Sequence, residues 1–544
     1  MIMTGKRNPF EIDYEVGFNE DGMILGLRSK LYSDGGAYAD LSTAIMERAM
    51  LHSDNAYFIP DVEIIGQVCK TNIHPHTAFR GFGGPKGVAV IESVIEDIAR
   101  HLRIDPLDVR QRNVYRSRYD VTPYGQKVEN NQLPALFGRL EETCDYRARR
   151  AKISLWNASR DAKGKHMLRG LSMTAVKFGI SFTTRFLNQG NALVQLHRDG
   201  SAQISTGAVE MGQGVNTRIA MLASECLGIT LPKIRVMTTS TEKNANTSPT
   251  AASTGTDING AATLNACGKI RKRLAAAAVL LQRTERERWP SRSAGLGTAG
   301  ELDITTVTDA ETDSVIFAND TVSCGSFSIA MKDLVNECYL SRVSLGEYGY
   351  HKTANLGFNK LSGQGYAFHY FTQGVACSEV ELNQLTGEVK VRRVDILMDL
   401  GRPIHEDLDK GQITGAFIQG MGWVTTENLV YNSEGLLLSH APSTYKIPSI
   451  QDTPRVFNVD LIPNEGNTVN IRGTKAVGEP PLLLAISVWT AIKNAIHYKA
   501  SSGTKAHELT QSLDIPATAE ANLRQLHPEA FARYEDSRAG LPRG

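Results

Sequence analysis

The sequence lacks any apolar run of about 18 residues, the length that a membrane-spanning helix requires. Its first residues, Met1 to Arg7, also lack the apolar segment of a secretory signal peptide. The seven cysteines are dispersed and include no CxxC pair, which argues against an iron–sulfur cluster or a zinc site within this chain. An odd, scattered set of cysteines indicates reduced thiols, so we expect a cytoplasmic protein.

Charge of one sign is not in excess either. The 59 Lys and Arg residues and the 58 Asp and Glu residues leave a formal net charge of +1. No global field therefore attracts the chain to nucleic acid or to a membrane, and we expect neither among its partners. A P-loop and a GxGxxG turn between a strand and a helix are both missing, so there is no nucleotide-binding fingerprint.

What the sequence does contain is typical of a large globular protein. Its 544 residues are 41% hydrophobic and 22% charged, and this length predicts two or more domains. Hydrophobic periodicity predicts strands within 8–32 (with a turn at 19–22) and near 192–198, 203–207, 233–239, 366–383 and 388–398. It predicts helices near 87–103, 106–113, 215–227, 257–283, 411–423 and 482–498.

Three segments have a weaker pattern. Residues 114–165 are polar and include the charged stretch Arg147–Arg150, so we expect an irregular connection between two domains there. Residues 284–322 are rich in Ser, Thr, Asp and Glu and are expected to form a surface excursion with a small hairpin. Beyond residue 515 the chain is polar and is expected to fray.

Residues 77–87 form a glycine-rich turn, Thr-Ala-Phe-Arg-Gly-Phe-Gly-Gly-Pro-Lys-Gly, directly before a predicted helix. Glycine is favoured where the chain takes φ > 0 or approaches a ligand closely. Such a turn at a helix start can direct backbone N–H groups toward an anion. An ordinary turn between two elements explains the segment equally well.

Further segments share this character, and each lies beside a predicted helix start. They are VEMGQG at 209–214, TAASTGTD at 250–257, GAFIQGMG at 415–422 and KAVGEPP at 475–481. One such turn means little. Five in one chain predict loops that converge on a large, polar, anionic ligand with a phosphate group.

Five motifs, in this order, carry a family resemblance: TAFRGFGGPKG, EMGQGVNT, SPTAASTGTDING, FHYFTQGVACSEVE and KAVGEPPLLLA. From residue 1 to about 515 the chain resembles the molybdenum-cofactor-binding part of the xanthine dehydrogenase/xanthine oxidase family. The resemblance implies a mixed α+β (mixed α/β) fold with two large molybdopterin-binding domains, the first incomplete. The implied division is 1–115 for the C-terminal part of the first domain, 116–165 for the connection, 166–515 for the second domain and 516–544 for a polar tail.

The resemblance also implies a substrate site. Arg48, in Met46-Glu47-Arg48-Ala49, resembles the arginine that holds the purine, which aldehyde oxidases generally lack; taken alone, it is more often a surface arginine. An arginine can stabilise negative charge that develops on a purine oxygen. Phe82 and Phe182 resemble the two aromatics on either side of the ring, although phenylalanine is more often a core residue. Thr183 is expected to donate a hydrogen bond to the substrate.

Glu479, in Gly478-Glu479-Pro480-Pro481, resembles the family's catalytic base. Without the resemblance it would be taken for a solvated glutamate at a helix N-terminus. Arg80 and Ala252 resemble residues whose backbone lies against the molybdenum coordination sphere. The positions that resemble groups bonded to the pterin or to the metal's oxo ligand are Gly212, Gln213, Ser253 and Gln419. In the family the cofactor's own sulfurs hold the metal.

The implied activity is hydroxylation of purines, from hypoxanthine and xanthine toward urate, with oxygen from water. Electrons would leave through 2Fe–2S clusters and FAD to NAD⁺. No site for these groups is encoded here, so partner chains or domains are expected to carry them. The resemblance also implies a homodimer of the assembled enzyme.

The chain departs from the family at its front, because the family's molybdenum region begins well before the point that Met1 matches. We therefore expect this chain alone to be inactive and poorly soluble. Smaller departures are Lys86, where glutamine is usual, and Asn8, where histidine is common. Two alternatives stay open: an oxidase of aldehydes or other N-heterocycles in the same superfamily, and an inactive truncated remnant.

Overall fold

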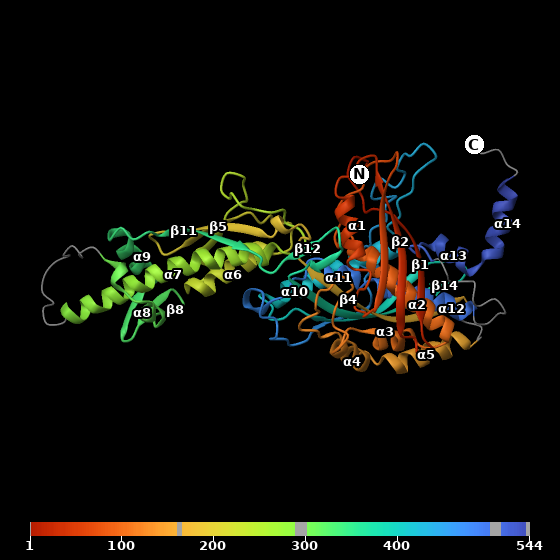
Figure 1. Ribbon diagram of the computed structural model, residues 1–544, viewed down its shortest axis with the longest axis horizontal. Helices are drawn as coiled ribbons and strands as arrows, with labels where there is room; N and C mark the ends of the chain where they lie inside the picture. Colours follow the sequence, from red (N-terminus) through yellow and green to blue (C-terminus); the bar gives the residue numbers. More distant parts are fainter. Residues whose placement is uncertain (1, 160–165, 289–301, 501–512, 540–544) are drawn as a thin grey trace.

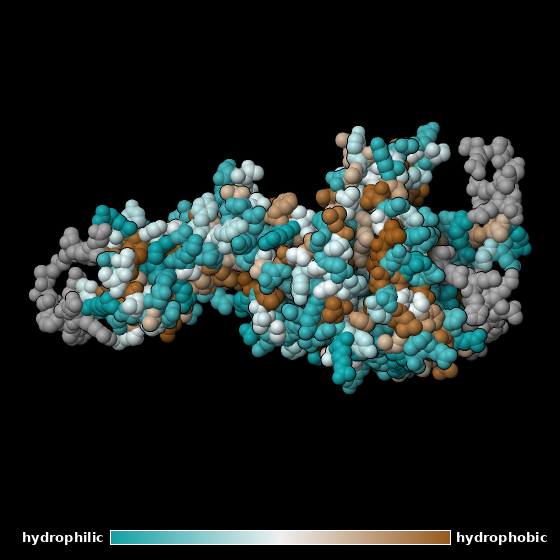
Figure 2. All heavy atoms as spheres, in the orientation of Figure 1, coloured by the Kyte–Doolittle hydropathy of each residue, from teal (hydrophilic) through white to brown (hydrophobic). Residues whose placement is uncertain are grey.

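The computed structural model describes residues 2–159, 166–288, 302–500 and 513–539. The molecule is elongated, with a broad body continued by a narrow arm built around the long helix α7 (Figure 1). On the face seen in Figure 2, hydrophilic side chains dominate the arm and the larger hydrophobic patches lie on the body. Among the described residues, no helix is long and apolar enough to cross a membrane.

The N-terminal sheet has the order β1–β2–β3. β1 (Phe10–Phe18) and β2 (Ile24–Gly36) are antiparallel, and β3 (Asp61–Lys70) lies parallel to β2. The predicted turn at 19–22 is confirmed, and Gly22 there has a φ of 82°. Along β1, half-buried and exposed residues alternate, as expected for a strand with one face on the core.

Helix α1 (Ser42–Met50) forms the crossover between β2 and β3 and packs against α2 (Gly84–Leu102). α2 confirms the helix predicted near 87–103, and Pro85 sits in its first turn, where proline is tolerated. α3 (Pro106–Asn113) has the predicted bounds, and the carboxylate of Asp105 caps it by accepting the Leu107 N–H at 2.9 Å.

The prediction of an irregular stretch at 114–165 is wrong over much of its length. Two helices, α4 (Leu133–Thr143) and α5 (Tyr146–Ala158), occupy this segment, and residues 160–165 lie outside the described residues. α4 buries Leu133, Leu136, Phe137 and Leu140, which follow the spacing of one helical face. The charged stretch is partly internal, because Arg149 forms ion pairs with the carboxylates of Glu379 and Asp395.

The central sheet of the body has the order β16–β15–β14–β4. Its strands are β4 (Met167–Ile180), β14 (Tyr370–Asn383), β15 (Val389–Asp399) and β16 (Val456–Leu461). β4 was not predicted, because its residues are buried on both faces and show no alternation of polar and apolar side chains. Helices α10 (Glu406–Thr425), α11 (Pro480–Leu483) and α12 (Ile486–Ala500) complete this core.

The arm contains a second four-stranded sheet of order β11–β5–β6–β7. Its strands are β5 (Gln189–Leu196), β6 (Ala202–Thr206), β7 (Ile234–Val236) and β11 (Gly346–Lys352). α6 (Val215–Leu227) and α7 (Gly255–Arg288) pack together against it and confirm two predicted helices. The predicted hairpin is confirmed by β8 (Ile316–Ala318) and β9 (Thr321–Cys324), while 289–301 lie outside the described residues.

The remaining elements are short. They are β10 (Phe327–Ala330), β12 (Gly357–Asn359), β13 (Gln364–Tyr366), α8 (Asp309–Asp313), α9 (Met331–Leu340), α13 (Ala519–Leu526) and α14 (Pro528–Ala539), with five 3₁₀ turns. The expected fraying beyond 515 is wrong for 519–539. The Thr518 hydroxyl caps α13, and Asn522 is buried with its amide bonded to the Gly387 and Ala517 carbonyls.

Candidate functional site

Glu479 lies at the start of α11, where Pro480 and Pro481 begin the helix. Its half-buried carboxylate joins two loops that are remote in sequence. Oε1 accepts the backbone N–H of Gly81 at 3.2 Å, and Oε2 accepts the hydroxyl of Ser253 at 2.8 Å. The carboxylate is therefore fixed in orientation by one backbone donor and one side-chain donor.

Arg80 ties the glycine-rich turn to two other segments. Its Nε donates to the Gly478 carbonyl at 2.6 Å, and its Nη2 and Nη1 donate to Gln412 and Gln419 on α10 at 2.9 and 3.4 Å. The Arg80 carbonyl in turn accepts a hydrogen bond from Arg7 Nη2 at 2.8 Å. Burial lowers the pKa of Arg80, and the charge of Glu479 opposes this shift. The glycine-rich turn is therefore fixed by both the side chain and the carbonyl of Arg80.

Ala252 and Ser253 both have left-handed backbone conformations, with φ of 53° and 58°. This conformation is costly for residues with a Cβ and persists where the surroundings demand it. Here it brings the Ser253 hydroxyl to Glu479, and a Cβ added at Gly478 would lie only 2.9 Å from that hydroxyl oxygen. Strain at two successive residues beside a bonded carboxylate is typical of a functional site.

The loop at 209–214 reaches the same region. The Val209 N–H donates to the Thr250 hydroxyl at 2.9 Å, which joins this loop to the one that carries Ala252 and Ser253. Gly212 has a φ of 95°, and a Cβ there would meet no atom within 4 Å. The side-chain amide of Gln213 bonds within the same loop: its N–H donates to the Val209 carbonyl and its oxygen accepts the Met211 N–H.

The N-terminus of α6 is already occupied by an anion from the chain itself. The Glu210 carboxylate accepts the N–H groups of Gly212, Gly214 and Asn216 at 2.9 to 3.1 Å. Burial raises the pKa of Glu210, but these backbone donors outweigh burial and the net shift is downward. These donors are therefore not free for an external anion.

The five segments singled out in the sequence do lie together. Glu479 accepts hydrogen bonds from Gly81 and Ser253, which joins three of the segments. Arg80 reaches the fourth at Gln419, which lies inside helix α10 and not in a turn as predicted, and Val209 joins the fifth to Thr250. A buried ion pair between Arg218 on α6 and Asp409 on α10, at 2.6 Å, also joins the helix after the 209–214 loop to α10. These five segments therefore lie together in the structure, four as loops and one as part of α10.

A second set of buried groups bonds to the 475–481 segment, which carries Glu479. Sequence reasoning missed these groups. The hydroxyl of Tyr370 on β14 donates to Asp257 on α7 at 2.6 Å and accepts the N–H of Ala476 at 2.9 Å. Burial raises the pKa of Asp257 to about 6, while hydrogen bonds from Tyr370 and Asn470 oppose this shift. Tyr370 does lie within the FHYFTQ motif, which was the available signal.

Arg48 is not a surface arginine: its side chain is buried, with 4% exposed. Its Nη1 and Nη2 donate to the carbonyls of Gly179 and Ser181 at 2.6 and 2.7 Å, and the guanidinium lies over the Phe178 and Phe368 rings. Burial lowers its pKa and the charge of Glu479 opposes this shift. A guanidinium has five N–H donors, so these two bonds leave others for a ligand.

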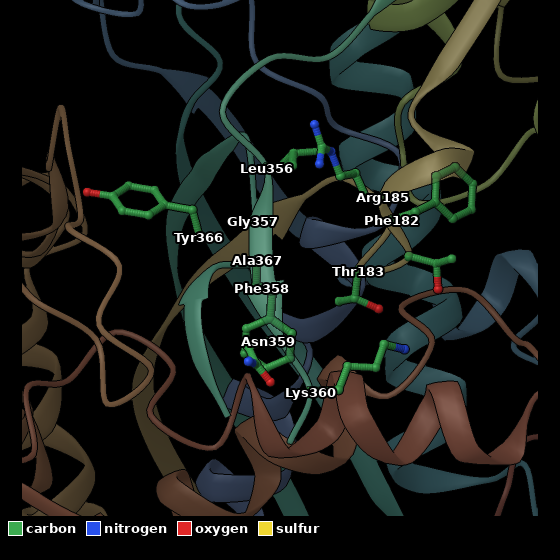
Figure 3. Close-up of a pocket in the computed structure, with 11 residues that line it drawn as sticks. Phe182, Thr183, Arg185, Leu356, Gly357, Phe358, Asn359, Lys360, Tyr366 and Ala367 are labelled. Carbon is green, nitrogen blue, oxygen red and sulfur yellow. The ribbon is translucent and has the colours of Figure 1, made fainter. Parts of the chain in front are cut away.

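Phe182 and Thr183 follow directly on Ser181 and line a cavity of about 380 Å³ (Figure 3). Glu479, Arg48 and Phe82 are not among its lining residues, so the cavity does not enclose the carboxylate. Phe82 is half-buried with a φ of 55°, and its carbonyl accepts a hydrogen bond from Lys86 Nζ at 2.9 Å.

The structure corrects one interpretation of the glycine-rich turn, which attributed its glycines to close approach of a cofactor. A Cβ at Gly83 would lie 1.9 Å from the Ile45 carbonyl, and one at Gly87 would lie 2.2 Å from the Ala49 carbonyl. Both positions therefore face the backbone of α1 and its end. These two glycines allow α1 and α2 to pack closely, and they do not face a ligand.

With this geometry in place, comparison with known proteins is informative. Residues 1–114 and 139–454 match the models of two molybdopterin cofactor-binding domains. The chain belongs to this molybdopterin cofactor-binding family. The match confirms the family resemblance and the molybdenum–molybdopterin cofactor that the motifs implied.

The chain is 40% identical over 521 residues to a xanthine dehydrogenase/oxidase of Mus musculus and 41% identical over 520 residues to one of Gallus gallus. Each comparison covers 96% of this chain but only 35% and 34% of the relative. The chain thus spans about a third of the length of these curated relatives.

Solved structures confirm the mixed α+β fold. The chain superposes on quinoline 2-oxidoreductase from Pseudomonas putida 86 with a TM-score of 0.79 at 20% identity, over 96% of this chain and 62% of that one. It superposes on an aldehyde oxidoreductase from Desulfovibrio gigas with a TM-score of 0.74 at 23% identity, over 96% of this chain and 49% of that one. At this identity the likeness concerns the fold alone.

The residues present fit the cofactor of this family. A polar pterin is bound through neutral hydrogen-bonding groups, and the site presents the Gln412 and Gln419 amides beside the Arg80 guanidinium. A Cβ at Gly212 would meet no atom within 4 Å, so there is open space beside that residue for close approach. These residues would hold the cofactor next to Glu479.

Proposed function

We propose that this chain is the molybdenum-cofactor part of an enzyme that hydroxylates purines, oxidising hypoxanthine and xanthine toward urate with oxygen from water. The observation that carries the proposal is the position of Glu479. Its carboxylate is held by Gly81 and Ser253, where the cofactor-binding loops meet, and lies within electrostatic reach of Arg48. A fixed base and a nearby buried cation are what attack on an electron-poor ring requires.

In this proposal Glu479 is the general base, which takes a proton from the oxygen nucleophile. The Ser253 hydroxyl and the Gly81 N–H orient it. Arg48 stabilises the negative charge that develops on the ring during attack. When bound, the molybdenum cofactor supplies the redox chemistry and accepts the two electrons.

Further residues have assigned roles in the same proposal. Phe82 and Phe182 provide flat walls for the heterocycle, and Thr183 donates a hydrogen bond to it. The backbone of Arg80 and Ala252 would lie against the metal's coordination sphere. The residues proposed to bond the rest of the cofactor are Gly212, Gln213, Ser253 and Gln419. To do so, the Gly212 N–H would exchange its bond to Glu210, and the Gln213 amide its bonds to Val209 and Met211, for bonds to the cofactor.

The proposal extends to the assembly. Residues 1–115 and 166–515 form the two cofactor-binding units, with 116–165 as their connection. Partner chains or domains carry 2Fe–2S clusters and FAD and pass electrons to NAD⁺. We propose a homodimeric, cytoplasmic enzyme.

The test is the Glu479→Gln variant of this chain, assembled with its electron-transfer partners. We expect kcat for hypoxanthine to fall by about 10² to 10⁴, the range for loss of a general base, with unchanged molybdenum content. Glu465→Gln is the matched control, because Glu465 is 78% exposed and pairs only with Arg402 in the described structure. Turnover by Glu479→Gln within threefold of the control would contradict the proposal.

A second candidate is an oxidase of aldehydes or other N-heterocycles. It is favoured by the two carbonyl contacts of Arg48, which give that residue a structural role independent of purines. Arg48→Met separates the candidates when kcat/KM is measured for hypoxanthine and for benzaldehyde. A purine enzyme loses hypoxanthine turnover selectively; the second candidate loses both in proportion. Full molybdenum loading without turnover of either compound would indicate an inactive remnant.

A further inference from the structure

The cavity lined by Phe182 and Thr183 has an unusual charge balance. Its eleven lining residues come from the turn after β4 and from the β12–β13 hairpin with its flanks, and they include two cations, Arg185 and Lys360, but no carboxylate. In the view of Figure 3, Arg185 lies toward one end and Lys360 toward the other, with Thr183 and Phe358 between them. A volume of about 380 Å³ is within the range of small-molecule sites.

Only one of the two cations is neutralised. Lys360 Nζ lies 2.7 Å from Glu47 Oε2 on α1, so this pair contributes little net charge. Arg185 is exposed, and the described residues give its guanidinium neither an ion pair nor a hydrogen bond. The cavity therefore carries one uncompensated positive charge, on a side chain with five donors suited to a carboxylate or an oxyanion.

The other walls suit a flat ring. Phe182, Phe358 and Tyr366 line the cavity, and the Thr183 and Thr184 hydroxyls provide hydrogen-bonding groups. Phe182 follows Ser181, whose carbonyl accepts a hydrogen bond from Arg48, so one wall of the cavity is adjacent in sequence to a partner of Arg48. A ring bound in this cavity lies within reach of the Arg185 charge.

We propose that this cavity binds the anionic form of planar heteroaromatic compounds, with Arg185 as the residue that selects for negative charge. The proposal rests on the proposed function for its link to Glu479, but the binding preference itself does not require turnover. Hydroxylation makes a heteroaromatic ring more acidic, so the cavity favours the more oxidised, anionic members of a substrate series. The aromatic lining residues select for flat compounds, and Arg185 selects among these for compounds with a negative charge.

The experiment uses the full chain and two probes of nearly equal shape, purine-6-carboxylate and the neutral purine-6-carboxamide. Kd is measured by calorimetry for the wild type, Arg185→Gln and Arg139→Gln. Arg139 is the matched control, an exposed arginine on α4 outside the cavity. We expect the wild type to prefer the carboxylate by about fivefold, the scale of one partly solvated ion pair, and this preference to weaken as salt is added.

In Arg185→Gln we expect carboxylate binding to weaken by about fivefold, with carboxamide binding unchanged, while Arg139→Gln behaves as wild type. Equal affinity for the two probes in the wild type, or equal behaviour of the two variants, would overturn the inference. Because binding is measured without turnover, a charge preference in a chain that lacks purine hydroxylation contradicts only the proposed function. Turnover without a charge preference contradicts only this inference.

Discussion

The hydroxyl of Ser253 lies 2.8 Å from Oε2 of Glu479, although 226 positions separate the two residues in the sequence. This hydrogen bond joins the strained loop before α7 to the carboxylate at the start of α11. It also explains why Ser253 retains a left-handed backbone, because the strain is offset by a bond to a charged acceptor.

Ser253→Ala tests this relationship. The variant removes one of the two donors to Glu479, so the carboxylate is less well oriented. We expect kcat of the assembled enzyme to fall by about tenfold, which corresponds to about 1.4 kcal/mol of barrier. Steady-state kinetics at saturating hypoxanthine measure this effect, and Ser323→Ala on β9 in the arm is the control. A value of kcat equal to that of the control would show that the hydrogen bond does not orient the base.

Asp257 makes stability depend on pH. Its pKa is raised to about 6 in the folded chain, from about 3.8 when exposed, so folding favours its protonated form. Its contribution to stability is therefore present below about pH 4 and is lost as pH rises through about 6. Between about pH 4 and pH 6, the ionisation of Asp257 lowers the free energy of unfolding by about 3 kcal/mol, and we expect Asp257→Asn to abolish this decrease.

The measurement compares urea unfolding of wild type and Asp257→Asn at pH 4 to 7. The difference in unfolding free energy between the two proteins should change between pH 4 and 6 and be constant above that range. Parallel curves across the whole range would show that Asp257 has an ordinary pKa in the folded chain.

Arg110, on α3, forms a buried ion-pair network with two glutamates of α2. Its guanidinium lies 2.8 Å from Glu92 and 2.8 Å from Glu96, and the side chains of Arg110 and Glu92 are 0% exposed. Arg110→Met leaves two buried carboxylates without their cation, and we expect the unfolding free energy to fall by about 3 to 5 kcal/mol.

Chemical denaturation measures this loss. Arg28→Met is the comparison, since Arg28 also pairs with two glutamates but its side chain is 60% exposed. A much smaller change is expected there because solvent screens the pairs. Similar losses in both variants would mean that burial is not what makes the Arg110 network important.

Gly83 tests the packing explanation for the glycine-rich turn. Gly83→Ala places a Cβ 1.9 Å from the Ile45 carbonyl, so α1 and α2 must move apart, and we expect a loss of about 3 kcal/mol or more. Gly138→Ala, on α4, is the control because a Cβ there meets nothing within 4 Å. That substitution should stabilise the chain by about 0.5 to 1 kcal/mol. A thermal shift that is equal for the two variants would contradict the packing explanation.

Local pattern was sufficient for much of the fold. α6 and α3 have the predicted bounds, and the turn at 19–22 is where the residues place it, because capping groups, glycine and apolar spacing act over a few neighbouring residues. The same reasoning missed α4, although its apolar residues follow helical spacing, and it missed α5, where charged residues interrupt the apolar positions. It also missed β4, whose residues are buried on both faces and so carry no strand periodicity.

The sequence by itself determined the family and the set of loops, because motif identity and order are local properties of the chain. Only the tertiary structure decided what those residues contact. It assigned Gly83 and Gly87 to helix packing, bonded Arg48 to two carbonyls at the end of β4, and joined Tyr370 and Asp257 to the loop that carries Glu479. The Arg48 and Tyr370 bonds join residues more than a hundred positions apart, and the glycine contacts join separate helices. Close packing in three dimensions, rather than any local preference, creates these relationships.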